Sequence, residues 1–530
     1  MERPPVHDVQ AIVGLIALAI AGAAVAHRLR TPAPSLLVLV GLAVGFIPGV
    51  PDTRVSPELV TIGVLPPLLF AAAQQVSLPD LRTVWKPVAL LAFGLVAVTA
   101  AAVAGLTHLV DSSIGIAAAF TLGAILASTD PVAVTALSRQ LRLPERIGTL
   151  VQSESLFNDA TSLVLFQVSV TAVTAGGMHA GGAVLRFVQL GGGGALLGAA
   201  VGGVASLLLR RGGDATVLAA LALVTPYVAA VTAEASHVSS VTAVIVAGLM
   251  VAERRVHSRQ PSGRLQAAAV YETVVFVLEN AIFAVIGLEL ATFIGNLPSG
   301  EGGRAAELAV LVTVVLLVVR GISMAVAAFV VSRREIAPSP DASYRPWQAA
   351  TVVTWAGARG VVPLAAALSI PLTVDTGGPF PHRPLLLVVA TAAVVATLVV
   401  QGTTLQPLVE RLGVVGDPGR LATQRDRARQ AITAAALSHL EDAAAAVEAS
   451  QDAVERVRRE LERRADALRG RLEAEEPAPP VTGSFTDLRL RLLEVEAREL
   501  SRLRTAGEVN AEVFRELQRQ LDLEATRLSG

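Results

Sequence analysis

The sequence predicts an all-α polytopic membrane protein, with about 13 transmembrane helices and a helical C-terminal tail. Of its 530 residues, 53% are hydrophobic and only 16% are charged, whereas soluble proteins average about 25% charged residues. Apolar runs of about 20 residues, enough to span a bilayer, recur from residue 9 to residue 409. After Leu412 the composition becomes rich in Ala, Arg, Glu and Leu. These observations predict a membrane domain over 1–412 and a tail over 413–530.

The spans are placed by hydropathy near residues 9–27, 33–50, 57–76, 84–110, 114–138, 145–175, 182–209, 214–234, 238–253, 268–295, 305–332, 346–371 and 384–409. The first run resembles a signal peptide, because Ala24–Ala26 look like a cleavage site. The residues before it, however, include Glu2 and Asp8 and have no net positive charge, so we expect a retained span.

Basic residues alternate between successive loops. Loops after odd-numbered spans hold sixteen Arg and Lys residues, and loops after even-numbered spans hold four, namely Arg54, Arg186, Arg304 and Arg383. Cytoplasmic loops carry the excess of Lys and Arg, so the N-terminus is predicted outside and the C-terminus in the cytoplasm. The single lysine, Lys86, among 43 basic residues indicates a GC-rich bacterial genome and hence a bacterial plasma membrane.

The tail contains two charged helical runs, near 419–475 and 485–528, separated by the helix-breaking segment Pro477–Gly483. Opposite charges recur along both runs. This pattern predicts a cytoplasmic helical pair or a short coiled coil.

The sixth predicted span carries an unusual row of polar residues. Residues four apart share a helix face, so Glu154 lies beside Asn158, and Ser155 beside Asp159. A carboxylate at bilayer depth costs about 2.5 kcal/mol or more. Such groups persist where they face the protein interior, which predicts a functional role for this stretch.

Two other spans contain helix breakers at their centres. The fifth contains Ser128–Pro131, in which proline disfavours helix at Asp130, and the twelfth contains Gly357, Arg359, Gly360 and Pro363. The two spans are seven apart and therefore cross in opposite directions. Two inverted repeats (spans 4–6 and 11–13) with broken crossing helices are the arrangement that many secondary transporters use for an ion site.

Several other classes of function are disfavoured. The chain has no cysteine, which excludes disulfides, zinc thiolates and cysteine nucleophiles. No basic stripe indicates nucleic-acid binding. Asp130 and Asp159 could suggest an intramembrane aspartyl protease, but the chain lacks a Gly-Xaa-Gly-Asp element. We therefore expect a secondary active transporter, not an enzyme, with no cofactor.

At these residues the sequence resembles the monovalent cation:proton antiporter-1 family, which contains the bacterial NhaP-type and eukaryotic sodium/proton exchangers. The matching stretches are LPPLLF at 65–70, STDPVA at 128–133, ESLFNDA at 154–160 and GARGVV at 357–362, with weaker matches at 281–289 and 401–407. They cover nearly the whole membrane domain, in order, and the tail lies outside them.

The resemblance implies a role for each matching residue. Asp159 would be the carboxylate that exchanges a proton for a cation, and Asp130 the acid of the broken helix. Na⁺ would be bound by Asp159, Ser155 and Thr129, with Asn158 as the partner of Asp159. Glu154 and Arg359 would form a buried ion pair that joins the two motifs. A homodimer is also implied.

One departure from the family concerns cation preference. Some members carry an acidic residue just after the third-span Pro-Pro element, where this chain has Ala71–Ala73 and Gln74. A site with one carboxylate fewer leaves the choice between Na⁺ and K⁺ open. Glu272 and Glu279, in the tenth span, could gate access or pair locally.

The predicted chemistry follows from these oxygen-bearing side chains. Oxygen ligands suit a hard cation such as Na⁺ or Li⁺, and burial disfavours the charged form of a carboxyl group. Asp159 would then hold a proton or a cation in turn, giving electroneutral one-for-one exchange by alternating access. A K⁺/H⁺ antiporter and a sodium-coupled organic-anion symporter are the alternatives. Only an antiporter lets a cation alone discharge a pH gradient.

Overall fold

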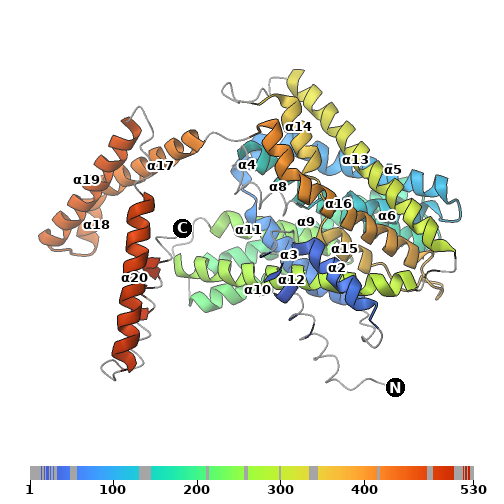
Figure 1. The fold of residues 1–530 in the computed structure, drawn as a ribbon, viewed down its shortest axis with the longest axis horizontal. Coiled ribbons are helices and arrows are strands. Elements are labelled where there is room, and N and C mark those ends of the chain that lie inside the picture. The colour runs from blue at the N-terminus through green and yellow to red at the C-terminus, as the bar shows by residue number, and fades with distance from the viewer. Residues whose placement is uncertain are drawn as a thin grey trace. The chain divides into compact units, whose positions relative to one another are not determined.

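The computed structural model describes the chain except at residues 1–13, 15–16, 18–19, 23, 26–27, 29–32, 48–55, 131–144, 211–213, 256–260, 296, 298–299, 334–343, 415–417, 474–481, 506–516, 519, 522 and 526–530. The described residues are helical apart from their connections and one isolated bridge between Thr373 and Pro379. The chain divides into two compact units, Met1–Gly416 and Asp417–Gly530 (Figure 1). The all-helical prediction is confirmed.

The first unit is a bundle of long helices. Its elements are α2 (Ala33–Gly45), η1 (Leu59–Val64), α3 (Leu65–Gln75), α4 (Leu78–Ala89), η2 (Leu90–Leu95), α5 (Val96–Val110), α6 (Ile116–Ala127), α8 (Glu145–Thr174), α9 (Ala180–Arg210), α10 (Ala215–Ala235), α11 (Ser240–Arg255), α12 (Pro261–Gly295), α13 (Glu301–Arg333), α14 (Pro346–Trp355), α15 (Val361–Leu368) and α16 (Arg383–Leu412). Each predicted span from 33–50 onward coincides with one or more of these elements. The first span, 9–27, lies largely outside the described residues.

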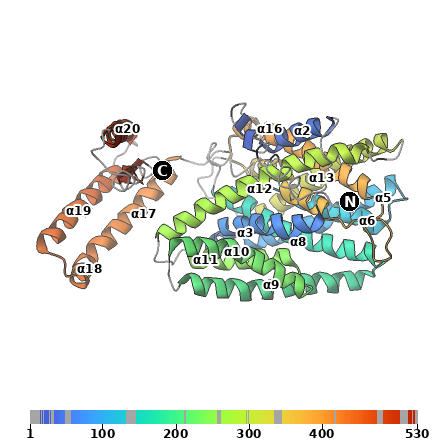
Figure 2. The ribbon, with the colours of Figure 1, turned by 90° about the horizontal axis from the view of Figure 1, so that it is seen from below.

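The composition of these helices fits a membrane protein. Among the described residues, seven helices are long and apolar enough to cross a bilayer. Large apolar side chains stand on their outer faces, such as Leu196 on α9 and Val310 on α13, which are 77% and 63% exposed. Figure 2 shows α9 along the edge of the first unit. Such exposed apolar faces are what a lipid environment requires.

Small residues let neighbouring helices approach closely, as is common within membranes. A Cβ atom added at Gly198 of α9 would lie 2.3 Å from the carbonyl oxygen of Ala243 on α11. One added at Gly287 of α12 would lie 2.3 Å from that of Val38 on α2. Gly194, Gly198 and Gly202 of α9 therefore permit close packing against α11, whereas Gly191 and Gly192 have no atom nearby.

Two helices are interrupted where the sequence predicted breaks. Helix α6 ends at Ala127 and continues as extended chain over Ser128–Asp130, whereas Pro131 lies outside the described residues. Helices α14 and α15 are separated by the non-helical residues 356–360. The two non-helical segments, 128–130 and 356–360, meet, because the Asp130 amide donates to the Ala358 carbonyl at 2.8 Å. We call these two segments the crossing.

The second unit consists of α17 (Pro418–Ser438), α18 (Leu440–Ala446), α19 (Gln451–Glu473) and α20 (Thr482–Thr505). Helices α17 and α19 pack against each other and are joined through α18. Ion pairs such as Arg458 with Glu441 and Arg502 with Glu499 lie on their exposed faces. The predicted breaker at Pro477–Gly483 lies mostly outside the described residues.

Candidate functional site

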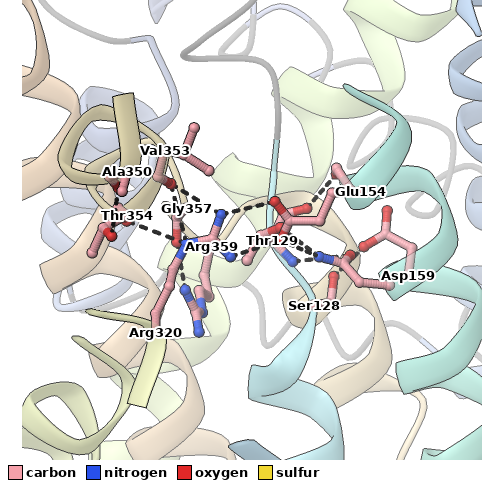
Figure 3. A network of polar contacts seen from close by, with 12 residues as sticks. Ser128, Thr129, Glu154, Asp159, Arg320, Ala350, Val353, Thr354, Gly357 and Arg359 are labelled. Carbon is pink, nitrogen blue, oxygen red and sulfur yellow. Dashed lines mark hydrogen bonds and ion pairs between the residues drawn. The ribbon is translucent and has the colours of Figure 1, made fainter. Parts of the chain in front are cut away.

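Helix α8 faces the extended segment of the crossing at its polar row. Glu154, Ser155, Asn158 and Asp159 are all buried, and Asp159 is only 5% exposed. Figure 3 shows Glu154 and Asp159 of α8 beside Ser128 and Thr129 of the crossing. The helical spacing of four residues thus brings together the groups that the sequence placed on one face.

Asp159 and Ser155 contact the crossing directly. The Ser128 hydroxyl donates a hydrogen bond to the Asp159 carboxylate, and the Ser155 hydroxyl donates to the Thr129 carbonyl at 2.5 Å. Ser128 was not among the predicted site residues, although its place in the Ser-Thr-Asp-Pro motif could have indicated it. The Asp159 carboxylate is therefore bonded to the Ser128 hydroxyl, and Ser155, one turn earlier on the same helix, is bonded to the Thr129 carbonyl.

Asn158 holds the extended segment in place. Its side-chain amide donates to the Thr129 hydroxyl at 2.6 Å and accepts from the Thr129 backbone amide at 3.4 Å. A helix break leaves backbone groups without their usual partners, and within a membrane these must be satisfied by protein or water. Asn158 supplies one such partner and fixes the Thr129 hydroxyl.

The expected ion pair between Glu154 and Arg359 is wrong. Glu154 pairs with Arg320 of α13, whose guanidinium nitrogens lie 2.7 and 3.0 Å from the two carboxylate oxygens. Arg320 also donates to the carbonyls of Val353 and Thr354, at 3.1 and 3.2 Å, where α14 ends. Both partners are almost fully buried. Sequence reasoning missed Arg320, although a single arginine near the centre of the eleventh predicted span usually marks a function.

Arg359 serves a different purpose. Its Nε donates to the Leu126 carbonyl at 3.0 Å, and another guanidinium nitrogen donates to the Gly357 carbonyl. Its backbone amide lies 3.4 Å from the Thr397 hydroxyl of α16. Arg359 therefore binds carbonyl oxygens left free at both helix breaks and ties the crossing together.

A cavity of ≈ 330 Å³ opens beside this network. Its polar lining is formed by Gln75, Thr129, Asp130, Gln152, Ser155, Asp159 and Glu279, and its apolar lining by Leu68, Leu69, Ala71, Ala72, Leu156, Val275 and Val361–Pro363. Carboxylate and hydroxyl oxygens without a soft donor suit a hard monovalent cation.

Four of the predicted site residues, Asp159, Asp130, Ser155 and Thr129, line this cavity, and Asn158 lies behind them. Glu154 and Arg359 do not line it. Of the two glutamates left open by the sequence, Glu272 is exposed on α12, and Glu279 lines the cavity.

Comparisons with known proteins show which family the chain resembles. The family profile described as sodium/hydrogen exchanger, transmembrane, matches residues 15–411. An uncharacterised Na⁺/H⁺ exchanger of Mycobacterium tuberculosis is 33% identical over 528 residues, covering 98% of this chain and 95% of that protein. The Na⁺/H⁺ antiporter ApNhaP of Aphanothece halophytica is 31% identical over 420 residues, covering 78% of this chain and 75% of that protein.

A solved structure shares the fold. The sodium proton antiporter MjNhaP1 from Methanocaldococcus jannaschii at pH 8 matches with a TM-score of 0.59 and 16% identity, covering 76% of this chain and 98% of that chain. The profile match over most of the chain and the nearly full-length relative establish the family. The protein belongs to the family of transmembrane sodium/hydrogen exchangers, which are cation/proton antiporters.

Proposed function

We propose that this protein exchanges one Na⁺ or Li⁺ for one H⁺ across the membrane, and that the two ions bind in turn at Asp159. The observation that carries this proposal is the place of Asp159: a buried carboxylate that borders an oxygen-lined cavity and touches the crossing of two interrupted helices. Family membership supports cation/proton antiport.

Competition at one group accounts for the coupling. A carboxylate removed from water is costly unless a proton or a cation neutralises it. Asp159 accommodates one or the other, so each change of the carrier from one side of the membrane to the other carries either the cation or the proton. The unloaded, charged form crosses poorly, which prevents a leak of either ion.

The neighbouring oxygens complete the cation site in this proposal. Ser155 donates its proton to the Thr129 carbonyl at 2.5 Å, which leaves lone pairs of its hydroxyl oxygen for Na⁺. The Thr129 hydroxyl is held by Asn158 and adds a second neutral oxygen. Asp130 also lines the cavity and adds negative charge near the cation.

The proposed transport cycle is alternating access. The cavity includes Gln75 at the end of α3 and Gln152 near the start of α8, whose side chains are hydrogen-bonded at 3.1 Å. Both adjoin, in the sequence, loops that the positive-inside rule assigns to the cytoplasm, so we infer that this cavity faces the cytoplasm. We propose thirteen spans with two inverted repeats, an external N-terminus and a cytoplasmic tail, in a homodimer of the bacterial plasma membrane.

A K⁺/H⁺ antiporter is the second candidate. The third-span wall of the cavity is formed by Ala71 and Ala72, where an acidic side chain would favour a small, strongly hydrated cation. A relative from Bacillus pumilus, 31% identical over 391 residues, is named a sodium, potassium, lithium and rubidium/H⁺ antiporter. Addition of Na⁺, Li⁺ and K⁺ in turn to proteoliposomes with an imposed pH gradient separates the two candidates.

The central test is Asp159→Asn in proteoliposomes that contain a pH-sensitive dye. We expect cation-driven proton movement to fall to the level of protein-free liposomes, because an amide neither releases a proton nor offers the cation a charge. Asp375→Asn, the same change in an exposed loop, is the matched control and should transport normally. Ordinary exchange by folded Asp159→Asn protein would remove Asp159 from this role.

A further inference from the structure

Glu279 stands in the cavity on a helix that the ion-binding motifs do not include. It lies on α12, whereas Asp159 lies on α8 and Asp130 in the crossing, yet all three line the same cavity. The acidic lining therefore extends beyond the predicted motifs.

The packing of α12 against α3 directs Glu279 toward the cavity. Two turns before Glu279, the ring of Tyr271 stacks on that of Phe70, with ring centroids 5.6 Å apart. The Tyr271 hydroxyl is anchored by the Ala222 carbonyl at 2.8 Å. Val275, one turn from each residue, lines the cavity together with Glu279. This face of α12 is thus a fixed wall of the cavity.

Within the described part of the chain, no partner accounts for the position of Glu279. Among the residues that the structure describes, no hydrogen bond or ion pair is made by its carboxylate, although the side chain is largely buried. The neighbouring Asn280 side chain donates to its own helix, to the Phe276 carbonyl at 2.6 Å. A carboxylate within a membrane bundle normally pairs with a cationic group or lines an ion path.

The part of the lining that comes from α3 explains why a carboxylate on the neighbouring helix α12 would matter. Ala71 and Ala72 of α3 offer the cavity only methyl groups, so the third span contributes no charge there. A cation that enters meets carboxylates from α8, from the crossing and from α12. Glu279 thus adds a carboxyl group to the lining, where α3 has none.

We propose that Glu279 is a cation-binding carboxylate of the cavity, which attracts Na⁺ and hands it to Asp159 without itself carrying the exchanged proton. This inference rests on the proposed function for transport. Its test by Na⁺ binding requires only that the cavity binds Na⁺. In this role Glu279 sets the apparent affinity for the cation and leaves the maximal rate and the stoichiometry to Asp159.

The test compares Glu279→Gln with Glu279→Asp and wild type in two assays. In proteoliposomes, the KM for Na⁺ of Glu279→Gln should rise roughly tenfold, with an unchanged maximal rate, because one nearby charge in a partly buried site is lost. Equilibrium binding of ²²Na⁺ to the purified protein should weaken to the same extent. Glu279→Asp keeps the charge and should recover most of the affinity.

The matched control is Glu272→Gln, which removes the same charge from an exposed position on the same helix, outside the cavity. It should bind and transport like wild type. An unaltered KM and binding constant in folded Glu279→Gln would overturn the inference. Loss of all exchange with normal ²²Na⁺ binding would overturn it too, because Glu279 would then carry the proton.

Failure of the proposed function looks different. In that case neither wild type nor the Glu279 variants would couple Na⁺ to proton movement. The ²²Na⁺ binding arm would still report whether Glu279 strengthens cation binding, since it needs no transport.

Discussion

At the scale of single residues, the buried pair of Glu154 and Arg320 is an example of charged side chains that hold helices together and do not border the cavity. Both side chains are almost fully buried and meet through two hydrogen bonds. Neither lines the cavity. Because Arg320 also binds two carbonyls at the end of α14, the pair joins α8 to the end of α14, next to the crossing, and adds no net charge.

A double-mutant cycle tests this pairing. Glu154→Gln and Arg320→Met should each lower the stability by roughly 3–5 kcal/mol, because each leaves one buried charge uncompensated. The double variant should lose much less than the sum of the two. Thermal unfolding in detergent is the measurement, and Glu154→Gln combined with Arg359→Met is the control pair, for which we expect a much smaller coupling. Strong coupling of Glu154 to Arg359, and none to Arg320, would contradict the structure.

The sequence pointed to one row of polar residues, missed Arg320 and left the role of Glu279 open, for a physical reason. The row of Glu154, Ser155, Asn158 and Asp159 follows from helical spacing. Arg320 and Glu279 lie on α13 and α12, far along the chain, and only the packing of helices brings them to the site. Hydropathy gives the position of a helix along the chain but not its neighbours. The pairing of Glu154 with Arg359 failed because it joined two motifs without that information.

At the scale of elements, the crossing is held by very close contacts. A Cβ atom added at Gly360 would lie 1.6 Å from a carboxylate oxygen of Asp130. The Asp130 segment cannot easily withdraw, since its amide is bonded to the Ala358 carbonyl. The glycine of the Gly-Ala-Arg-Gly motif is therefore required by space, and its absence of a side chain lets the two broken helices meet.

Gly360→Ala should thus prevent the two segments of the crossing from packing together. Overpacking of a tight interior typically costs about 1–3 kcal/mol, so we expect a lower unfolding temperature together with loss of cation-driven proton movement. Gly105→Ala, in α5 with no atom near the added methyl group, should be neutral or stabilising by up to ~1 kcal/mol. A fully active Gly360→Ala protein would show that the crossing tolerates a wider spacing.

The elements themselves were predictable to different degrees. Long apolar runs located the helices from residue 33 onward, because a lipid environment demands them, and the helix breakers located the two interruptions. The π-helical segments η1 and η2, next to Pro66 and Pro87, were not foreseen. Proline removes a backbone donor, but whether the helix then kinks or widens depends on its neighbours. The number of spans and the inverted repeats remain predictions.

At the scale of the whole molecule, the question is how much charge moves in each cycle. The bidentate pair of Glu154 and Arg320 is neutral as a unit. In the proposed cycle Asp159 is the group that alternates its load, with one proton in one direction and one cation in the other. Glu279 attracts the cation at the cavity but releases it there. The loaded forms of the carrier therefore have equal charge.

This balance predicts electroneutral exchange. Proteoliposomes held at zero membrane potential with K⁺ and valinomycin, and others held at an inside-negative potential, should show the same Na⁺-driven proton flux, and solid-supported membranes should record no sustained transport current. Asp159→Asn liposomes give the background. A current that reverses with the Na⁺ and H⁺ gradients would mean that a second proton accompanies each cycle. Glu279 would then be the first candidate to carry it, and its removal by Glu279→Gln should abolish the current while one-for-one exchange continues.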